Sequence, residues 1–120
     1  MMAPAWTSGR DEPLARQLAR SVLAVTLEDL PGDAVAKAKD CLLDFLACAF
    51  EARNLPWSRQ AVATARALAQ GSSIIGSSAA VSPADAAFAN ATLGHGLVRE
   101  DMHPASICHH GVVIWPTLLA

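Results

Sequence analysis

The stretch VAKAKDCLLDFLACAF, residues 35–50, decides the fold class of this chain. Its apolar side chains recur every three or four positions and share one helical face, which consists of Val35, Ala38, Leu42, Phe45, Leu46 and Ala49. Asp33 is suited to cap the start of this helix. The helix should end before Pro56, because the residue that precedes a proline avoids the helical region. The stretch therefore predicts an amphipathic helix with its apolar face in a core.

Further helices are expected on both sides of this one. The first begins at Asp11, with Pro13 in its first turn, and repeats apolar side chains at helical spacing. Others are expected over residues 58–70, from Ser82 to about 97, and from about 109 onward, while SSIIGSS (72–78) favours a short strand or an extended connector. Residues 1–10 are expected to be a disordered tail, and residues 11–120 to form one all-α domain. We interpret this domain as an incomplete helical bundle, because the last helix reaches Ala120 without a capping signal.

Composition limits the possible functions. The chain has 120 residues, of which 52% are hydrophobic and 17% charged, against about 25% charged in an average protein. Part of the apolar surface should therefore contact another segment or another subunit. The net charge of −2 and the lack of a basic stripe argue against nucleic-acid binding. No apolar run is long enough for a membrane span, and three cysteines, an odd number, suggest reduced thiols in the cytoplasm.

All four histidines lie in the stretch HGLVREDMHPASICHHGVVIW, residues 95–115. Their spacing matches no standard zinc pattern, so we expect no metal. A Cys108–His109 nucleophile pair is disfavoured, because sequence neighbours seldom reach the required geometry. On composition alone this is an ordinary polar loop, with His95 as a packed, hydrogen-bonded residue. The start of a helix at His109 or His110 could instead help to hold a substrate carboxylate.

The second half of the chain resembles a known family. PADAAFANATLGHGLVREDMHPASICHHGVVIWPTLLA (83–120) is similar to the MmgE/PrpD pattern DAAFANGTLAHALDFDDTHPAS…HPGAVVVPAALA, and AKDCLLDFLACAF (38–50) is similar to the family's A…LLDTLG…LAG helix. The resemblance extends from about Leu14 to Ala120. It implies a large helical domain joined to a smaller α/β lid, in chains several times longer than this one. This chain would then be the N-terminal portion of the helical domain without the lid.

The resemblance also implies a chemistry. Members of the family move protons next to a carboxylate of small polycarboxylates, need no metal or organic cofactor, and are commonly homodimers. The first hypothesis is therefore a cytoplasmic lyase of the dehydratase or decarboxylase type, seen as a fragment that could be inactive alone. It would form a homo-oligomer or associate with the missing family segments. The first alternative is an epimerase, which needs two proton-transfer groups and no leaving group. The second is a non-catalytic helical oligomerisation module.

Site residues follow from the resemblance position by position. His109 and Asp101 are the predicted catalytic residues, with Asp101 orienting His109 or a partner. The predicted substrate-binding residues are His103, Glu100 and His110. Two family positions have lost their polar atoms, because Val98 replaces the first acid of the cluster and Met102 replaces a threonine. A valine cannot accept a proton and a methionine offers no hydroxyl, so either specificity or activity should differ from the family pattern.

Overall fold

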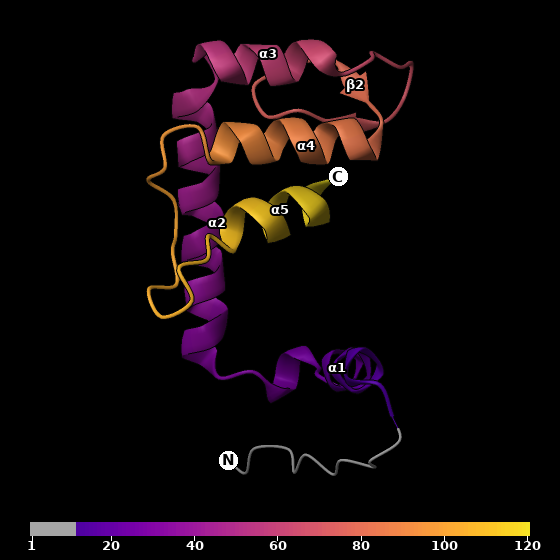
Figure 1. The fold of residues 1–120 in the computed structure, drawn as a ribbon, viewed down its shortest axis with the longest axis vertical. Helices are drawn as coiled ribbons and strands as arrows, with labels where there is room; N and C mark the ends of the chain where they lie inside the picture. Colours follow the sequence, from indigo (N-terminus) through magenta and orange to yellow (C-terminus); the bar gives the residue numbers. More distant parts are fainter. Residues whose placement is uncertain (1–11) are drawn as a thin grey trace. The chain divides into compact units, whose positions relative to one another are not determined.

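The computed structural model describes residues 12–120, in which five α-helices dominate (Figure 1). The helices are α1 (Leu14–Leu23), α2 (Gly32–Ala52), α3 (Pro56–Thr64), α4 (Pro83–Gly94) and α5 (Gly111–Leu119). A single 3-10 turn, η1 (Leu27–Asp29), precedes α2, and the short strands β1 (Ser72–Ser73) and β2 (Ala80–Val81) pair antiparallel. The all-α prediction is thus confirmed. The predicted tail, 1–10, lies outside the described residues.

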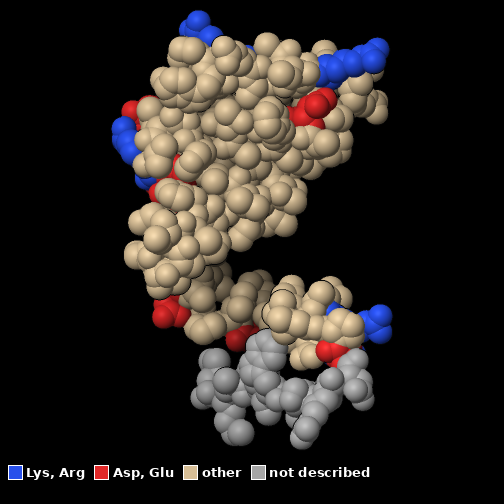
Figure 2. All heavy atoms as spheres, in the orientation of Figure 1, with Lys and Arg blue, Asp and Glu red and all other residues tan. Residues whose placement is uncertain are grey.

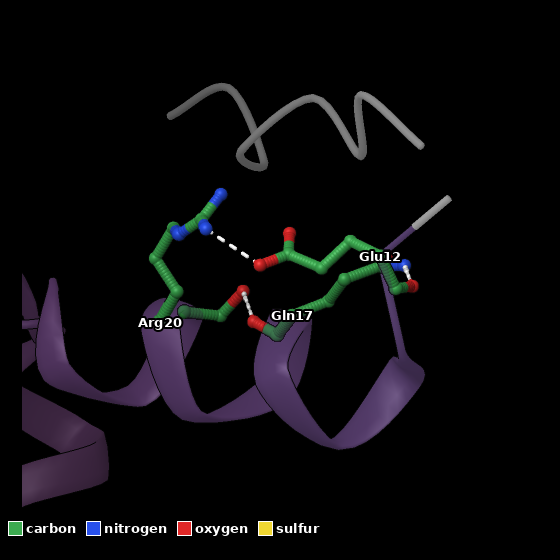
Figure 3. Close-up of polar contacts among 4 residues, drawn as sticks. Glu12, Gln17 and Arg20 are labelled. Atoms are coloured by element: carbon green, nitrogen blue, oxygen red, sulfur yellow. Dashed lines mark hydrogen bonds and ion pairs between the residues drawn. The ribbon is translucent and has the colours of Figure 1, made fainter. Parts of the chain in front are cut away.

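The described part of the chain divides into two compact units, of which the first ends at Val35 and the second spans residues 36–120. In the first unit, polar contacts stabilise the first turns of α1 (Figure 3). Glu12 accepts a hydrogen bond from Arg20 Nη2 at 2.6 Å, and its carbonyl oxygen accepts one from Gln17 Nε2 at 2.7 Å. The predicted apolar stripe of α1 is present, but among the described residues none of this helix is buried.

In α2 the predicted face is buried only in part, because Ala38 is exposed and Val35, Leu42 and Leu46 are half-buried. Phe45 and Ala49 are fully buried, together with Cys48 and Ala52 of the same side. The prediction that Asp33 caps the helix is wrong. The helix already begins at Gly32, so Asp33 lies inside the first turn and accepts a hydrogen bond from the next backbone N–H at 2.9 Å. An acidic side chain in the first turn still interacts favourably with the helix dipole.

The third helix is shorter than predicted, since it ends at Thr64 rather than near residue 70. The following segment pairs with the strand region instead, because Leu68 N–H donates to the carbonyl oxygen of Ala80 at 2.8 Å. Gly71 lies so close to β2 that a Cβ there would be 2.2 Å from Val81 O. This tertiary pairing outweighs the helix propensity of the alanines in residues 65–69.

Helix α4 is central to the second unit. Ser82 caps it as predicted, since its Oγ accepts a hydrogen bond from Asp85 N–H at 3.1 Å. The helix ends at Gly94 rather than near 97, and a turn that brings Val98 to a positive φ of 53° follows. α4 packs against both α3 and α5. The core cluster consists of Ala49, Ile74, Val81, Ala86, Ala89 and Leu93.

Surface charge, helix length and the state of the cysteines each bear on function. Figure 2 shows that charged side chains are sparse over the visible face of residues 36–120, which is mostly uncharged. No helix within residues 12–120 combines the length and the apolar character that crossing a membrane requires. The cysteines Cys41, Cys48 and Cys108 are all free thiols, which agrees with the predicted reduced state.

Candidate functional site

The loop between α4 and α5, residues 95–110, gathers three titratable side chains. His95 is the C-cap of α4, and His109 lies two residues before the first residue of α5. Between them in sequence, Glu100 turns inward, and its side chain is 0% exposed. Its Oε1 is hydrogen bonded to His95 Nδ1 and lies 2.9 Å from His109 Nδ1. The two imidazole rings meet edge to face, with centroids 5.1 Å apart.

The buried carboxylate of Glu100 is held in its ionised form. Burial by itself raises the pKa of this group, but the hydrogen bond from His95 and the two imidazoles outweigh burial, so that the pKa of Glu100 lies below its ordinary value. The contact with His109 is less well aligned than that with His95. His109 Nδ1 and Glu100 Oε2 are both buried without a hydrogen-bond partner in the described residues. The cluster thus holds one negative charge between two imidazoles.

Asp101 lies beside this cluster but has different surroundings. Its Oδ1 packs against Gly111, where a Cβ would fall 1.9 Å from that oxygen. A glycine at the first position of α5 therefore admits the carboxylate to the helix N-terminus, where negative charge is favoured. The acid that contacts His109 is Glu100, whereas Asp101 faces the backbone at the start of α5. The predicted catalytic role of Asp101 stays a prediction.

His103 and His110 lie apart from the cluster around Glu100. His103 Nδ1 pairs with Ser106 Oγ at 2.8 Å and accepts a hydrogen bond from Ser106 N–H at 3.3 Å. Its backbone N–H donates to Cys108 O at 2.9 Å, which closes a tight turn. The rings of His103 and His110 face each other with centroids 6.0 Å apart. The histidines of the loop thus form two separate pairs.

Sequence reasoning missed the position of His95. The sequence predicts a packed, hydrogen-bonded side chain; the hydrogen bond is present and goes to Glu100, but the side chain is 48% exposed rather than packed. A signal was available in the sequence, because a residue that ends a helix leaves its ring beside the loop that follows. The acid five positions later could then reach it.

The same three side chains could in principle be metal ligands. One nitrogen from each of His95 and His109 and one oxygen from Glu100 all lie within 4.8 Å of one another. A zinc ion bonded at about 2.0–2.2 Å would keep its ligand atoms about 3.3 Å apart. Here Glu100 Oε1 touches the imidazole nitrogens directly. The geometry therefore favours shared protons over a metal ion.

The two positions at which this sequence departs from the family pattern, Val98 and Met102, are both exposed. Val98 is 62% exposed, and Met102 is 48% exposed. Val98 has the left-handed backbone conformation that β-branched residues rarely adopt. Exposed apolar side chains therefore border the ionised cluster.

Comparisons with known proteins identify relatives of the chain. The family model described as MmgE/PrpD N-terminal domain matches residues 16–120. The chain is 31% identical over 109 residues to a cis-aconitate decarboxylase-like protein, oryM, of Aspergillus oryzae, with 87% of this chain and 22% of that protein covered. It is 26% identical over 95 residues to cis-aconitate decarboxylase of Aspergillus terreus, with 78% and 19% covered. The chain thus spans about a fifth of the length of these curated relatives. No solved structure matches significantly.

Proposed function

Because this chain belongs to the MmgE/PrpD family, we propose that it forms one wall of the active site of a lyase that acts on a small polycarboxylate. The observation that carries the proposal is the contact of His109, just before α5, with the buried, ionised Glu100. A histidine paired with a carboxylate is the usual arrangement of a general acid–base group. Decarboxylation is the preferred reaction, since both relatives are named for it.

The chemistry of the two lyase reactions fits an imidazole at this position. In a decarboxylation, the bond between a carbon and one carboxylate breaks, CO₂ leaves, and the electron pair remaining on the carbon skeleton takes up a proton. His109 in its imidazolium form would supply that proton and return to the neutral form. In a dehydration, a neutral imidazole would instead take a proton from carbon while an acid protonates the departing hydroxyl group. Each positioned acid–base group typically contributes about 10²–10⁴-fold to the rate.

Turnover and binding test the proposal together. In the first experiment the chain is incubated with cis-aconitate and CO₂ release is measured. In the second it is titrated with tricarballylate, a stable tricarboxylate, while the ring signals of the histidines are followed by NMR. We expect the chemical shifts of the His109 ring to change with added tricarballylate until binding is saturated. We also expect His109→Gln to remove any CO₂ release. The matched control is Glu51→Gln, which changes an exposed carboxylate on α2 that pairs with Arg99. If His109 is unaffected by millimolar tricarballylate, the site assignment is wrong.

A non-catalytic helical module is the second candidate function. It is supported by the exposed apolar side chains of α1 and by Val98 and Met102 beside the cluster. In that case the chain would self-associate through its apolar surface and would bind no tricarboxylate. Light scattering during the same titration separates the two candidates, because only the module predicts a stable oligomer without ligand binding. The epimerase alternative predicts uptake of deuterium from heavy water into a substrate carbon without loss of CO₂.

A further inference from the structure

The two imidazoles that contact Glu100 are both accessible. The side chain of His95 is 48% exposed and that of His109 is 22% exposed, although the carboxylate between them is completely buried. The ring centroids are 5.1 Å apart, which is shorter than a small tricarboxylate is long. A substrate that contacts His109 would therefore lie within reach of His95.

The contact with Glu100 determines which ring nitrogen of His95 carries the proton. An ionised carboxylate can only accept hydrogen bonds, so His95 Nδ1, which is hydrogen bonded to it, must carry hydrogen. In the neutral form of His95, the lone pair is then on Nε2, away from Glu100. His109 Nδ1 lies 2.9 Å from the same oxygen without an aligned hydrogen bond, so its tautomer does not follow from this contact. His103 has the opposite arrangement, because Ser106 N–H donates to its Nδ1 and the hydrogen must be on Nε2. His103 thus provides an internal reference for the Nε2–H form of a histidine ring.

The charge of the cluster depends on how many of its two imidazoles are protonated, because it contains a single carboxylate, Glu100. With one ring protonated and the other neutral, the three side chains have no net charge. With both rings protonated, two like charges would lie with centroids 5.1 Å apart. The cluster is therefore suited to hold one acid and one base at the same time, which is what a reaction that moves two protons requires.

We propose that His95 is the second proton-transfer residue of the site and the acid–base partner of His109. This inference rests on the proposed lyase function. In a dehydration, Nε2 of the neutral ring takes the proton from carbon and Nε2–H of the imidazolium protonates the leaving hydroxyl group. The C–H and C–O bonds break, a C=C bond forms and water leaves, while the two rings exchange protonation states. In a decarboxylation the imidazolium of His109 protonates the carbon, and the half-exposed His95 supplies the proton that returns His109 to its imidazolium form, regaining its own proton from water.

The first test needs no turnover. Long-range ¹H–¹⁵N spectra of the histidine rings distinguish the Nδ1–H form from the Nε2–H form. We expect Nδ1–H for neutral His95 but Nε2–H for His103, and we expect Glu100→Gln to abolish the preference at His95 only. Glu51→Gln should change none of the rings. An Nε2–H form at His95 in the unmodified chain would overturn the proposal.

The second test separates His95 from the proposed function as a whole. During titration with tricarballylate, the ring signals of His95 and His109 should move with the same dissociation constant. If only His109 moves, the lyase site stands and the role of His95 is wrong. If the signals of neither ring move, the proposed function fails as well.

A kinetic measurement tests the same role. With turnover of cis-aconitate, His95→Gln should lower kcat by about 10²-fold or more with little change in KM, and added imidazole should restore part of the rate. Unchanged kcat in this variant would contradict proton transfer by His95.

Discussion

The backbone at Val98 is one of two conflicts between residue type and conformation in residues 12–120, the other being Ile107 with a φ of 52°. The φ of 53° at Val98 lies in the left-handed region, which costs an L-residue about 1–2 kcal/mol and favours glycine, asparagine or aspartate. The same position carries an acid in the family pattern that the sequence resembles. The turn after α4 is therefore of a kind that an aspartate forms more easily than a valine does.

Replacing Val98 should consequently stabilise the chain. We expect Val98→Asn to raise the free energy of unfolding by about 1 kcal/mol, because asparagine adopts the left-handed conformation at lower cost. Chemical denaturation followed by tryptophan fluorescence measures the change. The control is Val113→Asn, another exposed valine, which lies in the regular helix α5 and should gain nothing. Equal effects of the two substitutions would mean that backbone strain at Val98 is not the cause.

The approach of α4 to α2 depends on the absence of a side chain at Gly94. A Cβ there would lie 2.3 Å from the ring of Phe45, which is fully buried and has no space to move. We expect Gly94→Ala to lower the free energy of unfolding by about 1–3 kcal/mol through overpacking, although alanine is the better helix former. Gly32→Ala in the first turn of α2 is the control, since nothing lies within 4 Å of its added Cβ. A thermal melt that is unchanged for Gly94→Ala would show that the helices can separate.

Asn90 connects α4 to β1 and to the segment that follows it. Its Oδ1 accepts a hydrogen bond from Ile75 N–H at 2.8 Å, and its Nδ2 donates to Ser73 O at 3.0 Å. The side chain is buried, so Asn90→Ala would leave two backbone groups without partners and should cost about 2 kcal/mol or more. Hydrogen exchange should show faster exchange of the Ile75 amide. Thr92→Ala is the control, because its hydroxyl only donates to a carbonyl of its own helix. Intact protection at Ile75 would argue against this connection.

At the scale of the whole molecule, local signals in the sequence predicted the helices better than the contacts between them. The face of α2 and the cap at Ser82 were predictable, because each depends on spacing within one element. The early end of α3 was not, since it depends on the pairing of Leu68 with Ala80, twelve residues away. The resemblance likewise pointed to the loop in which the structure gathers His95, Glu100 and His109. Only the three-dimensional path of that loop shows that Glu100, rather than Asp101, contacts His109 and that His95 joins them.

The buried Glu100 should make the stability of the whole chain depend on pH. Its pKa is lowered in the folded state, so the unfolded chain binds the proton more readily. The stabilisation is therefore complete above the ordinary glutamate pKa of about 4.3 and is lost as the pH falls through the lower folded value. The charges that face this carboxylate are those of His95 and His109. Burial raises the pKa of the Cys48 thiol on α2, and the negative charges of Asp44 and Glu100 raise it further.

Replacing this carboxylate separates its effect from those of the other acids. We expect Glu100→Gln to be less stable than the unmodified chain at pH 7 by about 1–3 kcal/mol, because a hydrogen bond to a charged group is weakened. The difference should shrink below pH 4, where the native carboxylate also becomes protonated. Denaturation at a series of pH values from 7 to 3 measures both effects. Glu51→Gln, at an exposed position, should follow the unmodified chain throughout. A constant difference between Glu100→Gln and the unmodified chain at all pH values would show that the side chain contributes through packing and not through its charge.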